Sequence, residues 1–168
     1  MIDFIEELKE KFCFVDQKDS GSGSTVSAQH DFELPDSTVI SLTSEQSRCT
    51  EVLFEPKSDI EHGASVQQMV VDSVRPMEME LNKVLLENIH LAGGNTMFEG
   101  FEDRLKSEVM EIKKKGKVQV IAPVERVYST WIGGSILTCI SSFNDNWILR
   151  QDYSEMGPNI SYRTGYLF

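Results

Sequence analysis

The fold of this chain is decided by one stretch, Ile89-His90-Leu91-Ala92-Gly93-Gly94-Asn95-Thr96, in which an apolar run ends in paired glycines. An amphipathic segment follows at residues 99–115, so the predicted order is strand, glycine turn, helix. Glycine has no Cβ atom, which lets the backbone approach a ligand closely, and the start of a helix offers free amide groups to anions. Without further context, a tight structural turn is the commoner interpretation, and a nucleotide-binding loop is the alternative.

On both sides of that stretch, the hydrophobic pattern predicts a mixed α/β fold with crossover connections. Five helices are predicted, at residues 3–15, 44–54, 65–74, 78–87 and 99–115. Strands are predicted at residues 31–34 and 38–42, as a hairpin around Pro35-Asp36-Ser37, and at residues 88–92 and 117–121. Residues 128–143 are predicted to begin extended and to continue as an apolar helix. The polar, serine- and glycine-rich residues 16–29 are predicted to form a flexible loop.

The composition of the 168 residues restricts the class of protein. With 40% hydrophobic and 26% charged residues, the chain resembles a soluble domain, and no apolar run reaches the roughly 20 residues of a membrane helix. The first residues lack the apolar stretch of a secretory signal, so an intracellular protein is expected. The net charge of -11 argues against nucleic acid as the main partner. The basic run Lys113-Lys114-Lys115 with Lys117 is interpreted as a solvated helix end, with a binding patch as the alternative.

The cysteines and histidines predict neither a metal centre nor a disulfide framework. The cysteines are odd in number and far apart in the sequence, so reduced thiols are expected at Cys13, Cys49 and Cys139. The histidines have no ligand spacing, and structural or surface roles are expected for His30, His62 and His90. No metal ligand and no catalytic residue is therefore assigned to these two residue types.

Segments from about residue 7 to residue 163 together resemble those of one known family. Before the glycine turn, the resemblance rests on Leu8-Lys9-Glu10-Lys11-Phe12-Cys13-Phe14-Val15, Glu33-Leu34-Pro35-Asp36, Val39-Ile40, Arg48-Cys49, Leu53-Phe54 and Pro56. At the turn it rests on Leu91-Ala92-Gly93-Gly94-Asn95-Thr96-Met97-Phe98 with Gly100, Asp103 and Arg104. After the turn it rests on Ile121-Ala122-Pro123, Glu125-Arg126, Tyr128-Ser129, Trp131-Ile132-Gly133-Gly134-Ser135-Ile136-Leu137, Trp147-Ile148, Gln151, Tyr153 and Gly157-Pro158. The register between these segments holds almost without gaps, so a chance match is not credible. The family that they resemble is the actin family.

The resemblance implies a partial actin-like fold of the ribonuclease H-like, or ASKHA, type, in which two lobes close over a nucleotide. By this resemblance the chain is similar to the C-terminal half only, which is the second lobe plus a C-terminal segment, and it lacks the N-terminal lobe. Residues 1–62, with the loop at 16–29, correspond to the small subdomain of the second lobe, and residues 63–127 correspond to its large subdomain. Residues 128–168 correspond to the segment that returns to the base of the first lobe.

The same resemblance implies the remnant of a nucleotide site. Lys9 and Glu10 match positions that line the adenosine. The loop that lies against the base and the phosphate end is matched by Gly93, Gly94, Asn95, Met97 and Phe98. Val127 stands where the family carries a lysine beside the adenine, which removes a cationic contact. ATP or ADP with magnesium is expected only if another lobe completes the site, and no metal ligand is assigned in this chain.

Catalysis is not expected of this chain. By the resemblance, the phosphate-gripping hairpins and the residues that orient the attacking water lie mainly in the other half of the fold, and phosphoryl transfer needs their positioning. The run Asp19-Ser20-Gly21-Ser22-Gly23-Ser24 is superficially similar to a phosphate hairpin, but it lacks flanking apolar strands and is interpreted as a linker. We therefore assign no catalytic residue and expect no ATPase activity.

Two further segments bear on assembly. Ser58-Asp59-Ile60-Glu61 occupies the position of the apolar loop by which actin subunits reach across the filament, and burying its two carboxylates unpaired would be costly. A homopolymer is therefore not expected. The apolar groove in which partners of actin insert helices is matched by Ile132, Ile136, Leu137 and Ile140, for which a plain core role is the alternative. Asn146 replaces an apolar residue of that groove.

These features together favour a non-catalytic, actin-like structural subunit that works with protein partners in a larger assembly. We expect neither nucleic acid nor a membrane as its partner. The resemblance implies a cytoskeletal assembly, including the axoneme of cilia, or a nuclear one, and a location in the cytoplasm or cytoskeleton. Two alternatives stay open, namely the nucleotide-binding half of an actin-type ATPase and a fragment of a full-length, filament-forming actin.

Overall fold

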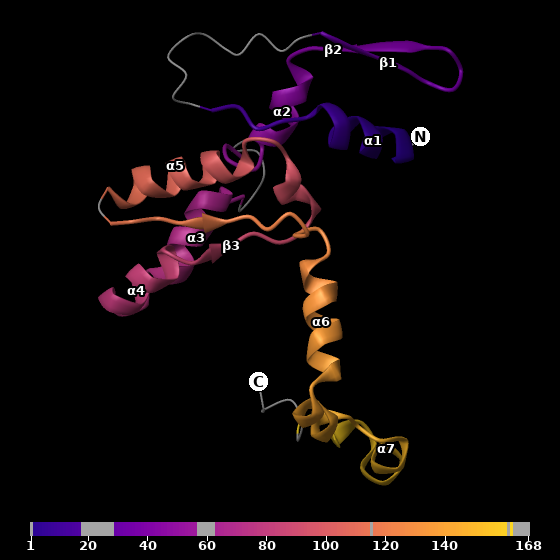
Figure 1. Ribbon diagram of the computed structural model, residues 1–168, viewed down its shortest axis with the longest axis vertical. Helices are drawn as coiled ribbons and strands as arrows, with labels where there is room; N and C mark the ends of the chain where they lie inside the picture. Colours follow the sequence, from indigo (N-terminus) through magenta and orange to yellow (C-terminus); the bar gives the residue numbers. More distant parts are fainter. Residues whose placement is uncertain (1, 18–28, 57–62, 115, 161, 163–168) are drawn as a thin grey trace. The chain divides into compact units, whose positions relative to one another are not determined.

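The computed structural model describes residues 2–17, 29–56, 63–114, 116–160 and 162. The chain divides into two compact units, Met1–Val127 and Tyr128–Phe168, and Figure 1 draws the second unit in orange to yellow. Helices and strands follow one another along the first unit, which confirms the predicted mixed α/β class. The second unit begins at the residue at which the predicted C-terminal segment begins, and the assignment of that segment to a lobe stays a prediction.

The centre of the first unit is a strand, helix, strand arrangement around the paired glycines. β3 (Ile89–His90) pairs in parallel with β4 (Val120–Ile121), and the amide of Leu91 extends the pairing by donating to the carbonyl of Ile121 at 2.9 Å. The 3-10 helix η1 (Gly94–Met97) follows β3, and α5 (Phe101–Lys113) then makes the crossover that a parallel pair requires. The predicted order of elements is confirmed, and both strands are shorter than predicted.

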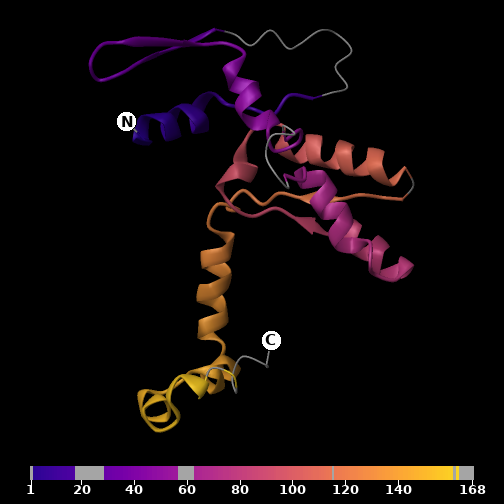
Figure 2. The same cartoon turned by 180° about the vertical axis from the view of Figure 1, so that it is seen from behind.

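α5 is buried along one face. Phe101, Leu105 and Val109 recur at every fourth residue, so they share this face, and they are 4%, 1% and 0% exposed. The face packs against α3 (Val66–Val74), and Figure 2 shows the two helices side by side from behind. α5 ends where Lys114 adopts a left-handed conformation. The core around α5 comprises Val15, Phe54, Val71, Val74, Leu86, Leu91, Phe101, Leu105, Val109, Val118 and Val120.

Three further predicted helices are present in the first unit. They are α2 (Glu45–Glu51), α3 and α4 (Met79–Leu86). α3 ends just before Pro76, because proline has no amide hydrogen and its ring clashes with the preceding turn. The side-chain amide of Asn82, on α4, donates to the carbonyl of Val74 at 2.7 Å, so α4 satisfies the open end of α3.

α1 (Ile2–Phe12) ends three residues before its predicted limit. After the helix, the amide of Phe14 donates to the carbonyl of Gln46 at 3.3 Å, and the amide of Val15 donates to the carbonyl of Glu99 at 2.8 Å. A parallel β-bridge joins Phe14 to Glu99. The prediction of helix up to residue 15 is wrong, because these carbonyls take the amides that a longer helix would have used.

The predicted hairpin is confirmed. β1 (His30–Glu33) and β2 (Val39–Leu42) pair antiparallel. In the turn, Ser37 has φ 64° and the side chain of Asp36 accepts a hydrogen bond from the amide of Thr38 at 3.0 Å, as aspartate commonly does in turns. The same hydrogen bond lowers the pKa of Asp36. Local turn chemistry therefore accounts for this part of the fold.

The second unit consists of short helices, namely α6 (Ser129–Cys139), η2 (Ser141–Asn146), α7 (Arg150–Met156) and η3 (Gly157–Asn159). The predicted apolar helix is present as α6, but it begins without the predicted extended start and ends where Ile140 becomes extended. The three elements after α6 were not predicted. Among the described side chains of this unit, Ile160 alone is buried.

Several predictions fall outside the described residues. They concern most of the loop at 16–29, including residues 19–24, as well as residues 58–61, His62 and the side chain of Asn146. The predicted boundary between residues 62 and 63 lies at the edge of an undescribed stretch. None of the helices in the described part of the chain has the length and apolar character needed to cross a membrane. Within the same residues, His, Cys, Asp and Glu side chains form no group of three or more that could hold a metal ion.

Candidate functional site

The loop between β3 and α5, which carries most of the predicted nucleotide residues, is fixed by its own hydrogen bonds. Gly93 has φ 94°, a conformation that residues with a Cβ atom rarely adopt. Its amide donates to the carbonyl of Arg126 at 2.8 Å, and its carbonyl accepts from the amide of Thr96 at 3.1 Å. The Thr96 hydroxyl donates to the same carbonyl at 2.7 Å. Both backbone polar groups of Gly93 are therefore engaged within the protein.

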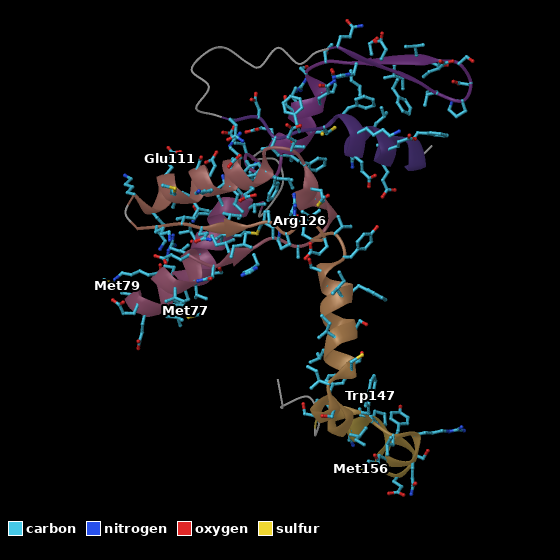
Figure 3. All side chains as sticks on the ribbon, in the orientation of Figure 1. Met77, Met79, Glu111, Arg126, Trp147 and Met156 are labelled. Atoms are coloured by element: carbon cyan, nitrogen blue, oxygen red, sulfur yellow. The ribbon has the colours of Figure 1, made fainter. Side chains whose placement is uncertain are left out.

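Arg126 ties this loop to the segment after β4. Its Nε donates to the carbonyl oxygen and to the hydroxyl of Thr96, both at 3.2 Å, and its Nη2 donates to that carbonyl at 3.1 Å. Its Nη1 donates to the carbonyl of Pro123 at 2.9 Å. Figure 3 labels Arg126 beside the loop. The sequence placed Arg126 in the family resemblance but gave it no role, because only the fold brings it to Thr96.

The outer surface of the loop is open. A Cβ atom added to Gly93 or to Gly94 would meet no other atom within 4 Å. Asn95 and Met97 are exposed, whereas Phe98 is half-buried and packs against the core. A flat ligand can therefore approach the backbone of the two glycines closely, although the turn is already complete without one.

The other predicted nucleotide residues, Lys9 and Glu10, lie in the last turn of α1, and both are exposed. The β-bridge between Phe14 and Glu99 connects the segment after α1 to the residue that follows the glycine loop. The two parts of the predicted site thus lie on segments that the backbone joins. Val127, predicted beside the adenine, is 40% exposed and carries no polar side-chain atom.

Two pockets in the first unit are lined by other residues. One pocket, of about 330 Å³, lies between α2 and α5 and is lined by Asp16, Gln17, Ser47, Arg48, Glu51, Glu55 and Arg104. The other, of about 410 Å³, lies between α1 and the hairpin and is lined by Phe4, Glu7, Phe32, Glu33, Leu34, Pro35 and Ser37. Neither pocket includes a predicted nucleotide residue.

The first of these pockets borders a buried ion-pair cluster that sequence reasoning missed. Arg104 is 2% exposed, and its guanidinium nitrogens lie 2.7 Å from Glu51 Oε1 and 2.8 Å from Glu108 Oε1. It also donates to the carbonyl of Asp16, and it lies over the ring of Phe54 at 5.1 Å. Burial lowers the pKa of Arg104, but the hydrogen bonds to Glu108 and Glu51 outweigh burial, and the pKa is raised. The cluster joins α5 to α2 and to the segment after α1, which is a structural role.

α6 presents three of the predicted partner residues as an apolar stripe. Ile132 and Ile136 lie one turn apart on the helix, Leu137 flanks them, and Ile140 is the extended residue that directly follows the helix. Ile136, Leu137 and Ile140 are 60%, 42% and 45% exposed, and Ile132 is half-buried. At least three of the four residues are therefore not core residues of the second unit.

More apolar side chains are exposed elsewhere in the second unit. Trp131 and Leu149 are 75% and 62% exposed, and Trp147, Tyr153 and Met156 are also exposed. Figure 3 labels Trp147 and Met156 on the part of the chain that follows α6. Such a surface offers dispersion contacts and apolar area to a binding partner, and it offers little charge.

A comparison with models of known protein families gives a match over residues 2–164, to the model described as Actin. The matched range covers most of both units and every segment on which the sequence resemblance rests. The resemblance is therefore confirmed at the level of the family, whereas the correspondence to one half of that family's fold stays a prediction.

Proposed function

The chain belongs to the actin family, and from that premise we propose that it is a non-catalytic, actin-like structural subunit of a larger protein assembly. The observation that carries this proposal is the exposure of apolar side chains in the second unit, in which Ile160 is the one buried residue among the side chains described. Large exposed apolar patches usually mark interaction sites. We infer that a partner covers this surface in the assembly.

The energetics of the second unit support the same inference. α6 has 11 residues and α7 has 7, and isolated helices shorter than roughly 12–15 residues are marginally stable in water. Fully burying one Ile, Leu or Met side chain contributes about 1.5–3 kcal/mol. A partner that covers the stripe on α6 would therefore stabilise the helix and the complex together.

The proposed partner is a protein. α6 has the sequence STWIGGSILTC, which contains no charged residue, and the whole chain has a net charge of -11. Nucleic acid binding rests on clustered basic residues, so a nucleic acid is a poor fit for this surface. From the resemblance, we propose a cytoskeletal assembly, including the axoneme, or a nuclear one, with a cytoplasmic or cytoskeletal location. The carboxylates at residues 58–61 favour assembly with other proteins over a homopolymer.

The apolar stripe can be tested on the purified chain with a dye that fluoresces on apolar surfaces and with light scattering after size-exclusion chromatography. We expect the chain to bind the dye or to self-associate, and we expect both effects to fall in the double variant Ile136→Ser, Leu137→Ser. The matched control is Met79→Ser, which replaces a side chain that is 74% exposed in the other unit and should change neither measurement. A stable monomer that binds no dye would contradict the proposal.

The absence of catalysis is tested separately. We expect no phosphate release above a buffer blank when the chain is incubated with ATP and magnesium, because phosphoryl transfer depends on positioned charges that the resemblance assigns to the other lobe. A contaminating ATPase is recognised with Lys9→Ala, since contaminant activity does not respond to that change. Turnover that disappears in Lys9→Ala would overturn the non-catalytic role.

A second candidate function is the nucleotide-binding half of an actin-type ATPase that a separate lobe completes. The closed turn at Gly93, with open space over Gly93 and Gly94, favours it. Calorimetric titration with ATP separates the two candidates, because the structural subunit should give no measurable binding. Weak binding that Lys9→Ala reduces, and that Lys106→Ala on the exposed side of α5 leaves unchanged, would instead favour the half-enzyme.

A further inference from the structure

Two thiols that lie far apart in the sequence are neighbours in the first unit. Cys13 follows α1 and Cys49 lies on α2, and Cys49 is among the neighbours that raise the pKa of Cys13. Hydrogen bonds of the backbone next to Cys13 also hold this segment against α2. The amide of Phe14 donates to the carbonyl of Gln46 at 3.3 Å, and the hydroxyl of Thr50 donates to the carbonyl of Phe14 at 2.6 Å. Gln46 and Thr50 are one turn apart on α2, so the chain at residues 13 and 14 is fixed against the turn that contains Cys49.

We propose that Cys13 and Cys49 form an oxidisable dithiol, which closes a disulfide between the end of α1 and α2. The backbone already holds residues 13 and 14 against α2, and closing the bond brings the two sulfur atoms to about 2.05 Å. The oxidant is a small-molecule disulfide, and oxidised glutathione is the probe. This site lies outside the predicted nucleotide residues and outside the apolar stripe of α6.

The two thiols differ in exposure, which sets the order of the reaction. Cys49 is exposed and Cys13 is half-buried. Burial, together with the hydrogen bond and the charge of Cys49, raises the pKa of Cys13 to about 12, while the nearby Lys9 acts in the opposite direction. The thiolate is the reactive form of cysteine. Cys49 therefore reacts first with the external disulfide, and Cys13 resolves the product.

Both steps are thiol–disulfide exchanges. Cys49 loses its proton to solvent, and its sulfur attacks one sulfur of oxidised glutathione, so that the other glutathione leaves as a thiolate and takes up a proton. Cys13 then loses its proton, and its sulfur attacks Cys49 Sγ in the mixed disulfide, which releases the second glutathione. In sum, two protein thiols are oxidised to one disulfide, and one oxidised glutathione is reduced to two glutathione molecules.

The disulfide would change how firmly α1 is held. In the reduced chain, the ring of Phe12 at the end of α1 lies 5.3 Å from His30 and 6.1 Å from Phe32 on the hairpin. The covalent loop closed by Cys13 and Cys49 contains that hairpin, so the bond removes conformational freedom from the unfolded chain. Oxidation would therefore stabilise α1, together with the predicted nucleotide residues on its last turn, against α2.

The test oxidises the full chain under native conditions with glutathione and oxidised glutathione at graded ratios. The remaining thiols are then alkylated, and peptides are mapped without reduction. We expect a cross-linked pair of peptides that contain Cys13 and Cys49, lighter by two hydrogens than their sum, and a midpoint of thermal unfolding raised by roughly 5 to 10 °C. If Cys13 and Cys49 both stay alkylated in excess oxidant, or if Cys139 is the main cross-linked residue, the proposal is overturned.

Two variants separate the roles of the thiols. Cys139→Ser, on the exposed surface of α6, is the matched control and should leave the cross-link between Cys13 and Cys49 intact. Cys13→Ser should accumulate glutathione on Cys49, because the resolving thiol is absent. The same oxidation in denaturant removes the fold, and the share of cross-links between Cys13 and Cys49 should then fall. An equal share in the native and the denatured chain would overturn the proposal.

The pH dependence tests the order of the two steps. Because the pKa of Cys13 is raised to about 12, its thiolate is scarce near neutral pH and becomes more abundant as the pH rises. Conversion of the mixed disulfide into the cross-link should therefore accelerate with pH and show no plateau below about pH 9. Closure that is independent of pH over this range would contradict Cys13 as the resolving thiol.

Discussion

The two units of this chain bury apolar side chains to very different extents. In the first unit, eleven apolar residues form one buried cluster around α5. In the second unit, among the side chains described, Ile160 alone is buried, while Trp131 and Trp147 are 75% and 52% exposed. The sequence of α6 is nevertheless strongly apolar. Apolar composition therefore makes a core only where a second face of the same chain packs against it.

This difference divides the chain into a unit with a buried apolar core and a unit whose apolar side chains are mostly exposed. The chain has two tryptophans, and both lie in the second unit. Tryptophan fluorescence therefore reports on the second unit, whereas far-ultraviolet circular dichroism reports on the helices of both. The predictions below follow unfolding by one or both of these signals.

The largest effect is expected from Arg104→Met in the first unit. The substitution keeps most of the apolar stem but removes the Arg104 cation from beside Glu51 and from beside Glu108, whose side chain is 9% exposed. Breaking a buried ion pair by removing one partner typically costs about 3 to 5 kcal/mol. We expect a loss of this size in urea unfolding followed by circular dichroism, with little change in the native tryptophan spectrum.

The matched control for this prediction is Lys106→Met, which removes a cation from an exposed position two residues further along α5. Substitutions at such positions usually change stability by less than about 0.5 kcal/mol. If both variants unfold like the original chain, Arg104 does not hold α5 to α2, and the first unit owes its stability to the apolar cluster alone.

A smaller loss is expected from Gly100→Ala at the start of α5. Gly100 has φ 80°, and a Cβ atom there would lie 2.5 Å from the carbonyl oxygen of Val15. The combined cost of backbone strain and overpacking is roughly 2 to 4 kcal/mol. Gly94→Ala is the control, since a Cβ atom at Gly94 would meet nothing within 4 Å. Equal stability of the two variants, measured by urea unfolding, would show that the approach of residue 15 to α5 is not required.

Local patterns in the sequence were sufficient for most elements of the first unit. The amphipathic pattern of residues 99–115 predicted the helix α5, and Pro35-Asp36-Ser37 predicted the hairpin, in which Asp36 caps the turn. In both cases the interactions that decide the structure lie within a few residues of one another. The paired glycines likewise predicted the turn at Gly93, because a positive φ is a property of one residue and its neighbours.

The features that the sequence did not reveal depend on contacts between distant segments. α1 ends early because residue 15 pairs with Glu99, and Arg104 is charged yet buried because Glu51 lies on another helix. Cys13 and Cys49 are likewise brought together only by the packing of α2. In the candidate site, sequence similarity could indicate the glycine loop. The hydrogen bond from Arg126 to Thr96, which holds that loop in place, could be seen only in the folded structure.

The smallest effect is expected in the second unit, in the change of tryptophan fluorescence when urea unfolds the chain. Because Trp131 and Trp147 are mostly exposed in the isolated chain, unfolding should shift their emission little, while circular dichroism is lost. Trp147 packs edge-on against Phe143 at 5.4 Å, so its emission should respond more to unfolding than that of Trp131. The variant Trp131→Phe leaves Trp147 as the one tryptophan that reports. Burial by a partner should shift the emission to shorter wavelength. A large shift on unfolding the isolated chain would instead mean that the second unit buries its own aromatic residues in solution, and the proposed partner surface would lose its basis.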